Sequence, residues 1–239
     1  MSKDPLTPQL LINFIRENSV LSRRDIMTQL MAGGITVNGT VTTHAQIPIS
    51  SKDRVAVDHT VIYPTPRLYV KFNKPTNVIS TFDDPSARRD LRFYLKKYKL
   101  PQTLRPCGRL DRDSSGLLLF SNDGYFINHV LHPNHAVLKT YAIQLNKPLS
   151  PSHQSQLQLG LFLPDGPISI DFQPSQSKTQ FLVTISVGRN RILRRAFDYF
   201  GYDIVTLHRQ SIGTISLGNL PSGQFETIPE SQIKNLALN

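Results

Sequence analysis

Apolar residues with helical spacing occur near the N-terminus. The first stripe predicts a helix over about residues 9–18, because its apolar side chains recur at i, i+1, i+4 and i+5: Leu10, Leu11, Phe14 and Ile15. Ser22, followed three residues later by Asp25, resembles a capping box. It predicts a second helix that ends at Gly33-Gly34.

Short strands follow these helices. Residues 35–37 and 40–41 flank Asn38-Gly39, a dipeptide that accepts the positive φ angles of a type I′ turn and therefore predicts a hairpin. A further strand is expected at 54–57. Two helices and a hairpin in so short a stretch indicate a small N-terminal domain over residues 8–62.

A second, larger domain begins after a linker. Pro64 and Pro66 each bias the preceding residue towards extended conformations. Apolar and polar positions then alternate, which predicts a strand that stops at Lys74-Pro75, with these apolar positions: Leu68, Val70 and Phe72. Mixed strand and helix patterns continue to the C-terminus, so we expect one α+β domain over residues 67–239.

Near the C-terminal end, residues 191–200 predict an amphipathic helix. Its apolar face comprises Ile192, Leu193, Ala196, Phe197 and Phe200. The opposite face carries Arg191, Arg194, Arg195 and Asp198. Taken alone, this polar face is that of a solvated helix with an Arg194–Asp198 pair.

The composition excludes several protein classes. A single cysteine in 239 residues excludes a disulfide framework and a multi-thiolate metal site within one chain. The longest apolar runs, such as 117–120, are too short to span a bilayer. Asp and Pro residues near the N-terminus stand where a signal peptide needs apolar residues. We therefore expect a cytoplasmic protein.

Positive charge is concentrated in one segment. The formal net charge is +10, and residues 63–110 alone carry eleven basic and three acidic residues, whereas the rest of the chain is near neutral. Such a local surplus favours a surface that faces a polyanion. Solvated Lys and Arg on surface helices are the simpler alternative.

The N-terminal domain resembles a known RNA-binding module. Arg23 and Arg24 lie in the first turn of the second helix, where the helix dipole disfavours cations and a negatively charged partner would compensate. Together with the Ile35-Thr36-Val37-Asn38-Gly39 stretch, they resemble the S4-type module of ribosomal and RNA-modifying proteins. Gly33-Gly34 stands where that family often has a basic residue.

The segment from Gly108 to Leu119, GRLDRDSSGLLL, carries the most specific pattern in the chain. Its spacing alone describes a charged turn before an apolar strand, in which Asp111 could serve only as a hydrogen-bond acceptor. However, Gly-Arg-Leu-Asp, four residues and Gly-Leu-Leu resemble the signature of the RsuA and RluA superfamily of pseudouridine synthases. Further segments occur in that family's order and favour its RsuA branch, among them Lys74-Pro75, Lys139-Thr140-Tyr141, Gly188-Arg189-Asn190-Arg191 and Ile212-Gly213.

This resemblance implies a mixed, mostly antiparallel central sheet and a set of catalytic residues. Asp111 is the expected nucleophile, Arg194 its paired arginine, and Tyr141 the ring that stacks on the target base and assists at its carbon 5. Contacts with RNA are expected from the following basic residues: Arg23, Arg24, Lys74, Arg109, Arg189, Arg191 and Arg195. Without the resemblance, Tyr141 would be taken for an ordinary core residue on a strand.

The implied reaction requires no cofactor, because uridine and pseudouridine are isomers. The expected partner is large-subunit ribosomal RNA, because the 188–195 stretch and Phe120 resemble large-subunit members, and we expect a monomer without a metal. His129, His132 and His135 could suggest a metal site, but Pro133 interrupts any helix that would align them.

Three alternatives stay open at this point. The chain could be a non-catalytic RNA-binding or ribosome-assembly factor of the same fold, or it could act on small-subunit ribosomal RNA or on transfer RNA. The sequence also leaves open whether Asp111 attacks the ribose, attacks the base or promotes elimination to a glycal.

Overall fold

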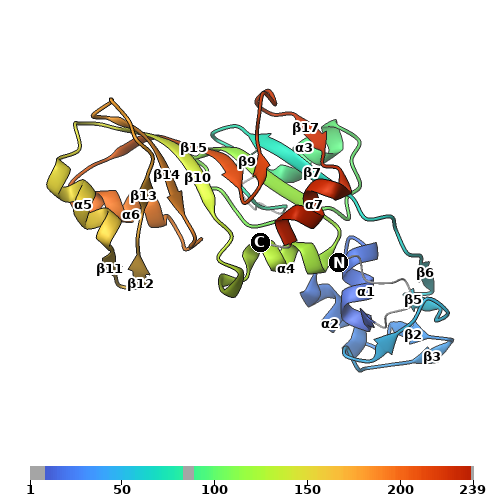
Figure 1. Ribbon diagram of the computed structural model, residues 1–239. Coiled ribbons are helices and arrows are strands. Elements are labelled where there is room, and N and C mark those ends of the chain that lie inside the picture. Colours follow the sequence, from blue (N-terminus) through green and yellow to red (C-terminus); the bar gives the residue numbers. More distant parts are fainter. Residues whose placement is uncertain (1–8, 83–88, 238–239) are drawn as a thin grey trace.

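A computed structural model describes residues 9–82 and 89–237, and the N-terminal part folds around its own small core (Figure 1). Two helices pack against a sheet with the strand order β3-β2-β5-β6, and a short β1–β4 ladder closes the module. The elements are β1 (Gln9–Leu10), α1 (Leu11–Asn18), α2 (Arg23–Met31), β2 (Ile35–Val37), β3 (Thr40–Val41), β4 (Pro48–Ile49), β5 (Val55–Val57) and β6 (Thr60–Ile62).

The local signals read from the sequence are present in this module. The Ser22 hydroxyl accepts a hydrogen bond from the Asp25 backbone N–H, and the Asp25 carboxylate accepts one from the Ser22 N–H, so the capping box is confirmed. Asn38 and Gly39 have φ angles of 54° and 82°, as the hairpin turn requires.

A mixed sheet organises the larger part of the chain. Its strand order is β13-β14-β10-β15-β9-β7-β17, and every neighbouring pair in this order is antiparallel except β15 and β9, which are parallel. The strands of this order are β7 (Tyr69–Lys74), β9 (Ser115–Ser121), β10 (Lys139–Leu145), β13 (Asp171–Phe172), β14 (Gln180–Ile185), β15 (Ile204–Ile212) and β17 (Phe225–Thr227). The α+β fold and the mostly antiparallel sheet are therefore confirmed.

Smaller elements flank this sheet. Two short strands extend it, β8 (Arg105–Pro106) on β9 and β16 (Ile215–Ser216) on β15, and β11 (Leu161–Leu163) with β12 (Gly166–Ile168) forms a separate hairpin. The helices are α3 (Leu91–Lys97), α4 (Gly124–Leu131), η1 (Pro133–His135), α5 (Pro151–Leu159), α6 (Ile192–Asp198) and α7 (Glu230–Ala237).

The sheet buries its faces against three groups of helices (Figure 1). Leu118 and Phe120 of β9 pack with α3, whereas Leu117 and Leu119 of the same strand pack with α4 and α7. At the other end of the sheet, β10 and β14 pack on α5 and α6. Because side chains alternate along a strand, one face carries α3 and the opposite face carries α4 and α7.

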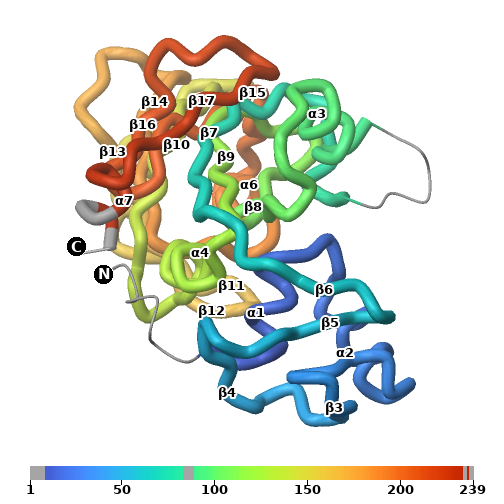
Figure 2. The backbone as a smooth tube through the Cα atoms, turned by 90° about the vertical axis from the view of Figure 1, so that its right-hand side faces the viewer, coloured from blue at the N-terminus to red at the C-terminus, as the bar shows by residue number. Residues whose placement is uncertain are grey.

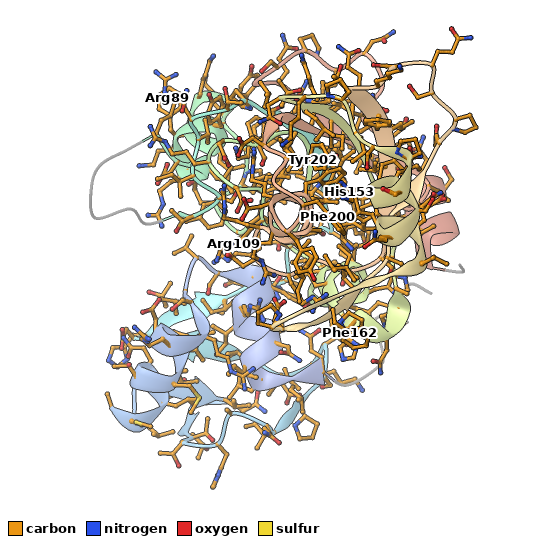
Figure 3. The ribbon with its side chains drawn as sticks, turned by 90° about the vertical axis from the view of Figure 1, so that its left-hand side faces the viewer. Arg89, Arg109, His153, Phe162, Phe200 and Tyr202 are labelled. Carbon is orange, nitrogen blue, oxygen red and sulfur yellow. The ribbon has the colours of Figure 1, made fainter. Side chains whose placement is uncertain are left out.

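Helices α5 and α6 belong to a single layer at the far end of the sheet. The His153 ring of α5 stacks on Phe200, just after α6, with a centroid distance of 4.5 Å, and its Nδ1 lies 3.0 Å from the Tyr202 hydroxyl (Figure 3). The apolar face predicted for α6 is buried at Ile192 and Phe197. This layer positions the arginines of α6 relative to the sheet.

The N-terminal module contacts the larger part through the end of α1 (Figure 2). The Arg105 guanidinium donates to the carbonyl oxygen of Val20 at 2.8 Å, and the Gly124 N–H donates to the Glu17 carboxylate at 3.1 Å. In the connecting segment, the Thr65 N–H donates to the Asn18 side-chain oxygen at 2.7 Å. The two parts are thus joined by polar contacts at the C-terminal end of α1 and just after it, and by the linker.

No helix among the described residues is long and apolar enough to cross a membrane. Within the same residues, no group of three or more His, Cys, Asp or Glu side chains is arranged to hold a metal ion. Part of the basic 63–110 segment, residues 83–88, lies outside the described residues.

Candidate active site

Asp111 lies on a tight turn immediately before β9. Its backbone carbonyl accepts a hydrogen bond from the Ser114 N–H at 3.1 Å, which closes the turn, and the preceding Leu110 is buried in the core under α6. The Asp111 side chain is 25% exposed. A short polar turn between a buried leucine and a buried strand therefore presents a carboxylate at the protein surface while its backbone stays anchored.

Hydrogen bonds from the segment after β7 hold this turn. The Ser80 hydroxyl donates to the Leu110 carbonyl at 2.6 Å and accepts from the Leu110 N–H at 3.1 Å. The Asn77 N–H donates to the Arg112 carbonyl at 2.7 Å. The backbone on both sides of Asp111 is thus fixed by groups that are distant in sequence, and the carboxylate is placed before any ligand binds.

Lys74 supports the same turn from below. Its side chain is fully buried, and Nζ donates to the carbonyl oxygens of Ser114, at 2.8 Å, and Pro75, at 3.0 Å. Burial lowers the pKa of Lys74 to about 8, while the negative charges of Asp111 and Asp113 oppose that shift. In this structure, Lys74 has no exposed surface from which to contact RNA. It is a structural cation beneath the turn.

The arginine nearest to Asp111 is Arg191. Its Nη1 lies 3.9 Å from Asp111 Oδ2 and 3.2 Å from Asp113 Oδ1. Arg191 is the N-cap residue of α6 and has a φ of 45°, a left-handed conformation that non-glycine residues adopt infrequently. The helix start thus directs a cation towards both carboxylates of the turn.

Arg194 has a different partner from the one that the sequence suggested. Its Nε lies 3.2 Å from Asp113 Oδ2, and its Nη atoms donate to the carbonyl oxygens of Ile204, at 2.6 Å, and Asp113, at 3.3 Å. The expected pair with Asp111 is therefore replaced by a pair with Asp113. The reason is geometric: Asp113, two residues further along the turn, extends its carboxylate towards α6, while Ile204 of β15 holds the guanidinium from the other side.

Two further arginines of this region share one carboxylate. Asp165, in the turn between β11 and β12, accepts hydrogen bonds from Arg195 at 2.6 and 3.0 Å and lies 3.3 Å from Arg189. Arg189 also donates to the backbone carbonyls of Asp165 and Pro167. The hydrogen bond from Arg195 lowers the pKa of Asp165. In this structure, the Asp165 carboxylate of the hairpin is thus an ion-pair partner of both arginines.

Tyr141 lies in the middle of β10 and is only 7% exposed. Its hydroxyl accepts a hydrogen bond from Arg209 Nη1 at 3.4 Å. Arg209 is itself buried in β15, and its role is not apparent from the sequence, because its neighbourhood Leu-His-Arg-Gln-Ser contains no pattern that distinguishes it from a surface arginine.

The remaining basic residues predicted to contact RNA are exposed. Arg23 and Arg24 lie in the first turn of α2, and Arg109 precedes the Asp111 turn. In the view of Figure 3, Arg109 lies between the N-terminal helices and the larger part of the molecule. The exposed cations therefore occur on both sides of the contact between the two parts.

The structure brings only some of the predicted residues together. Asp111, Arg191 and Arg194 meet around one turn, and Tyr141 belongs to the same buried cluster as Leu110, the residue before Asp111. Sequence reasoning missed the supporting groups, which are Asn77, Ser80, Asp113, Asp165 and Arg209. An anchored carboxylate flanked by fixed arginines can act as a nucleophile or a general base on a bound anionic ligand.

Comparison with known proteins agrees with this chemistry. Residues 68–199 match the family of RNA pseudouridylate synthases. The chain is 31% identical to the ribosomal large subunit pseudouridine synthase B of Bacillus subtilis, with 93% of each chain covered. It is 28% identical to the ribosomal small subunit pseudouridine synthase A of Haemophilus influenzae, with 95% of this chain and 98% of the relative covered. A crystal structure of a pseudouridylate synthase superposes with a TM-score of 0.68 at 26% identity, over 95% of this chain and 99% of that one.

Proposed function

Because the chain belongs to the RNA pseudouridylate synthase family, we propose that this isomerase converts one uridine, or a very few, of large-subunit ribosomal RNA to pseudouridine, with Asp111 as the nucleophile. The observation that carries the assignment of Asp111 is its anchored turn. Ser80, Asn77 and Lys74 hold the backbone on both sides of a carboxylate that is still partly exposed.

The reaction determines what the site must do. The bond between uracil N1 and ribose C1′ breaks, the base turns, and a bond between C5 and C1′ forms. C5 then loses its proton and N1 gains one, so atoms and electrons balance without a cofactor. A carboxylate nucleophile acts best in a site that excludes water and keeps it ionised. Three cations, Lys74, Arg191 and Arg194, lie around the turn that carries this carboxylate.

Tyr141 and Arg109 are proposed to hold the target nucleotide. A uridine within a stack cannot present its glycosidic bond to Asp111, so the nucleotide must leave the stack and enter the site. Tyr141 would stack on the extruded base and assist at C5. Arg109, two residues before Asp111, would contact the nucleotide or the gap that it leaves.

Exposed and half-buried cations are proposed to bind the RNA backbone. Arg23 and Arg24 on the N-terminal module, Arg191 at the site, and Arg189 and Arg195 beside the β11–β12 hairpin are the candidates. Because phosphate contacts release counterions, affinity for RNA is expected to fall steeply with salt. With ribosomal RNA as its substrate, the enzyme is proposed to act in the cytoplasm.

The N-terminal module is proposed to be an S4-type RNA-binding domain over residues 8–62, separate from a catalytic domain over 67–239. Its separate core supports this division. Removal of residues 1–62 should leave a folded domain that still modifies RNA, at lower efficiency. The measurement is cooperative unfolding of the 63–239 fragment together with its rate on RNA. A fragment that does not fold would contradict the two-domain proposal.

The choice of large-subunit RNA rests on the 188–195 stretch and Phe120, and the relatives at 31% and 28% identity act, by their names, on different subunits. The decisive experiment incubates the purified protein separately with large-subunit RNA, small-subunit RNA and bulk transfer RNA, and then maps pseudouridine by sequencing. Modification of large-subunit RNA is expected. Modification confined to small-subunit or transfer RNA would overturn the substrate, and no modification of any RNA would overturn the activity.

A further inference from the structure

A row of four residues crosses the sheet at the base of the site. Lys74 on β7 is paired with Gly116 on β9, Gly116 with Arg209 on β15, and Arg209 with Tyr141 on β10. Residues paired across neighbouring strands direct their side chains to the same face. This face is the one that carries α3 and α6, and Lys74 in the row holds the Asp111 turn through the Ser114 carbonyl.

Gly116 allows β9 and β15 to approach each other closely within this row. Its φ is +99°, and a Cβ at this position would lie 2.3 Å from the Arg209 carbonyl oxygen. Any other residue would therefore both strain the backbone and force β9 and β15 apart. The short approach at Gly116 brings the backbone of Arg209 next to the strand that follows the Asp111 turn.

Arg209 has specific contacts with both of its neighbouring strands. Its Nε donates to the Leu117 carbonyl at 2.7 Å, and its Nη1 donates to the Tyr141 hydroxyl at 3.4 Å. Its Cζ lies 5.9 Å from the centroid of the Tyr141 ring. The pairing of β10 and β15 shifts register between Thr140 and Tyr141. Such irregularities redirect side chains and are frequent beside active sites.

Burying Arg209 is costly. The residue is 4% exposed, no carboxylate pairs with it among the described residues, and its Nη2 is buried without a hydrogen-bond partner. A buried cation without a counter-ion destabilises a fold, because the cost of removing its charge from water is not compensated. Its charge also opposes the protonated forms of Lys74 and Lys139. Packing alone does not account for an arginine at this position.

We propose that Arg209 is a positioning residue, which fixes the ring and the hydroxyl of Tyr141 for the target base through a guanidinium anchored on the Leu117 carbonyl. The inference rests on the function proposed above, because it assigns to Tyr141 the surface on which the base stacks. Arg209 itself need not touch the RNA. Its loss should therefore slow the chemical step and leave RNA affinity unchanged.

The test compares Arg209→Lys with His208→Gln. His208 is the preceding residue on β15, directs its side chain to the opposite face, where its Nδ1 lies 2.9 Å from the Ser115 hydroxyl, and is the matched control. With RNA in saturating amounts, Arg209→Lys should lower the single-turnover rate by about tenfold or more, since small displacements of positioning groups cost up to about 10²-fold. The Kd for RNA should stay within about twofold, and His208→Gln should change neither quantity.

A second measurement does not depend on activity. In thermal unfolding, Arg209→Lys and Tyr141→Phe are combined in a double-mutant cycle, and the Tm shift of the double variant should be smaller than the sum of the single shifts. Additive shifts, a wild-type rate for Arg209→Lys, or a rate loss that a weaker Kd explains would each overturn the proposal. If the wild-type protein forms no pseudouridine, the proposed function fails instead, and the unfolding cycle still decides whether Arg209 and Tyr141 are coupled.

Discussion

The two sides of the site are held by different means. On the sheet side, the buried row of Lys74, Gly116, Arg209 and Tyr141 is fixed by strand pairing and by hydrogen bonds to backbone carbonyls. On the solvent side, the arginines of residues 189–195 are held mainly by carboxylates of the Asp111 turn and the β11–β12 hairpin.

This difference has an energetic consequence. Exposed ion pairs contribute little and are weakened by salt, whereas a buried polar group that loses its partner costs several kcal/mol. The sheet side should therefore be rigid and insensitive to salt, and the solvent side should rearrange when a polyanion competes for its arginines. The first suits placement of the reacting groups and the second suits capture of RNA.

Within the solvent side, the largest effect is expected at Arg194, whose side chain is only 13% exposed. Arg194→Ala removes a guanidinium that bonds the Ile204 and Asp113 carbonyls, and it should lower the single-turnover rate by about 100-fold or more. Arg195→Ala, the matched neighbour, loses contacts with Asp165 and the Asn190 carbonyl and should cost less than about tenfold. Equal losses in the two variants would show that Arg194 has no special place in the site.

A smaller effect should appear in the pH dependence of stability. The pKa of Lys74 is about 8 in the folded protein, because of burial, and near 10.4 in the unfolded chain. Between these pH values the unfolded state binds more protons, so Lys74 makes the free energy of unfolding rise with pH, by about 3 kcal/mol in all.

Lys74→Met should abolish the part of the pH-dependent rise in unfolding free energy that comes from Lys74. The measurement is urea unfolding of both proteins from about pH 7.5 to about pH 10.5, a range that spans the folded-state and unfolded-state pKa values of Lys74. Lys71→Met is the control, since Lys71 lies on the same strand but pairs with Glu226 near the surface. A constant difference between wild type and Lys74→Met across this range would contradict the burial of a titrating Lys74.

The smallest effect is expected at Asp165, on the solvent side. Asp165→Asn removes the ion pairs with Arg189 and Arg195 and one negative charge, while the backbone contacts of both arginines remain. RNA binding at low salt should therefore tighten by about two- to fivefold, and the gain should shrink as salt rises. Asp171→Asn on β13 is the charge-matched control. Weaker binding by Asp165→Asn would instead mean that Asp165 orients the two arginines for RNA.

Local features of the fold were accessible from the sequence. The capping box at Ser22, the Asn38-Gly39 turn and the apolar face of α6 depend on residues within one or two turns of each other, and all are present. These predictions succeed because the determining contacts are short in sequence. The role proposed for Asp111 likewise rests on a contiguous signature.

The contacts of the site depend on long-range geometry. The pairing of Lys74, Gly116, Arg209 and Tyr141 joins residues from four strands, and no local pattern sets that register. The burial of Lys74 follows from the same pairing, and its positive charge gave no sign of that burial. The exchange of Asp111 for Asp113 as partner of Arg194 depends on the direction of one turn, which composition and spacing do not determine.

The most direct test of the account is the single-turnover rate of Asp111→Asn on an RNA that the wild-type protein modifies. The variant keeps the shape of the side chain and removes the nucleophilic carboxylate. It should fold, bind the RNA with a Kd within about threefold of wild type, and form no detectable pseudouridine. A rate within about tenfold of the wild-type rate would contradict the assignment of Asp111.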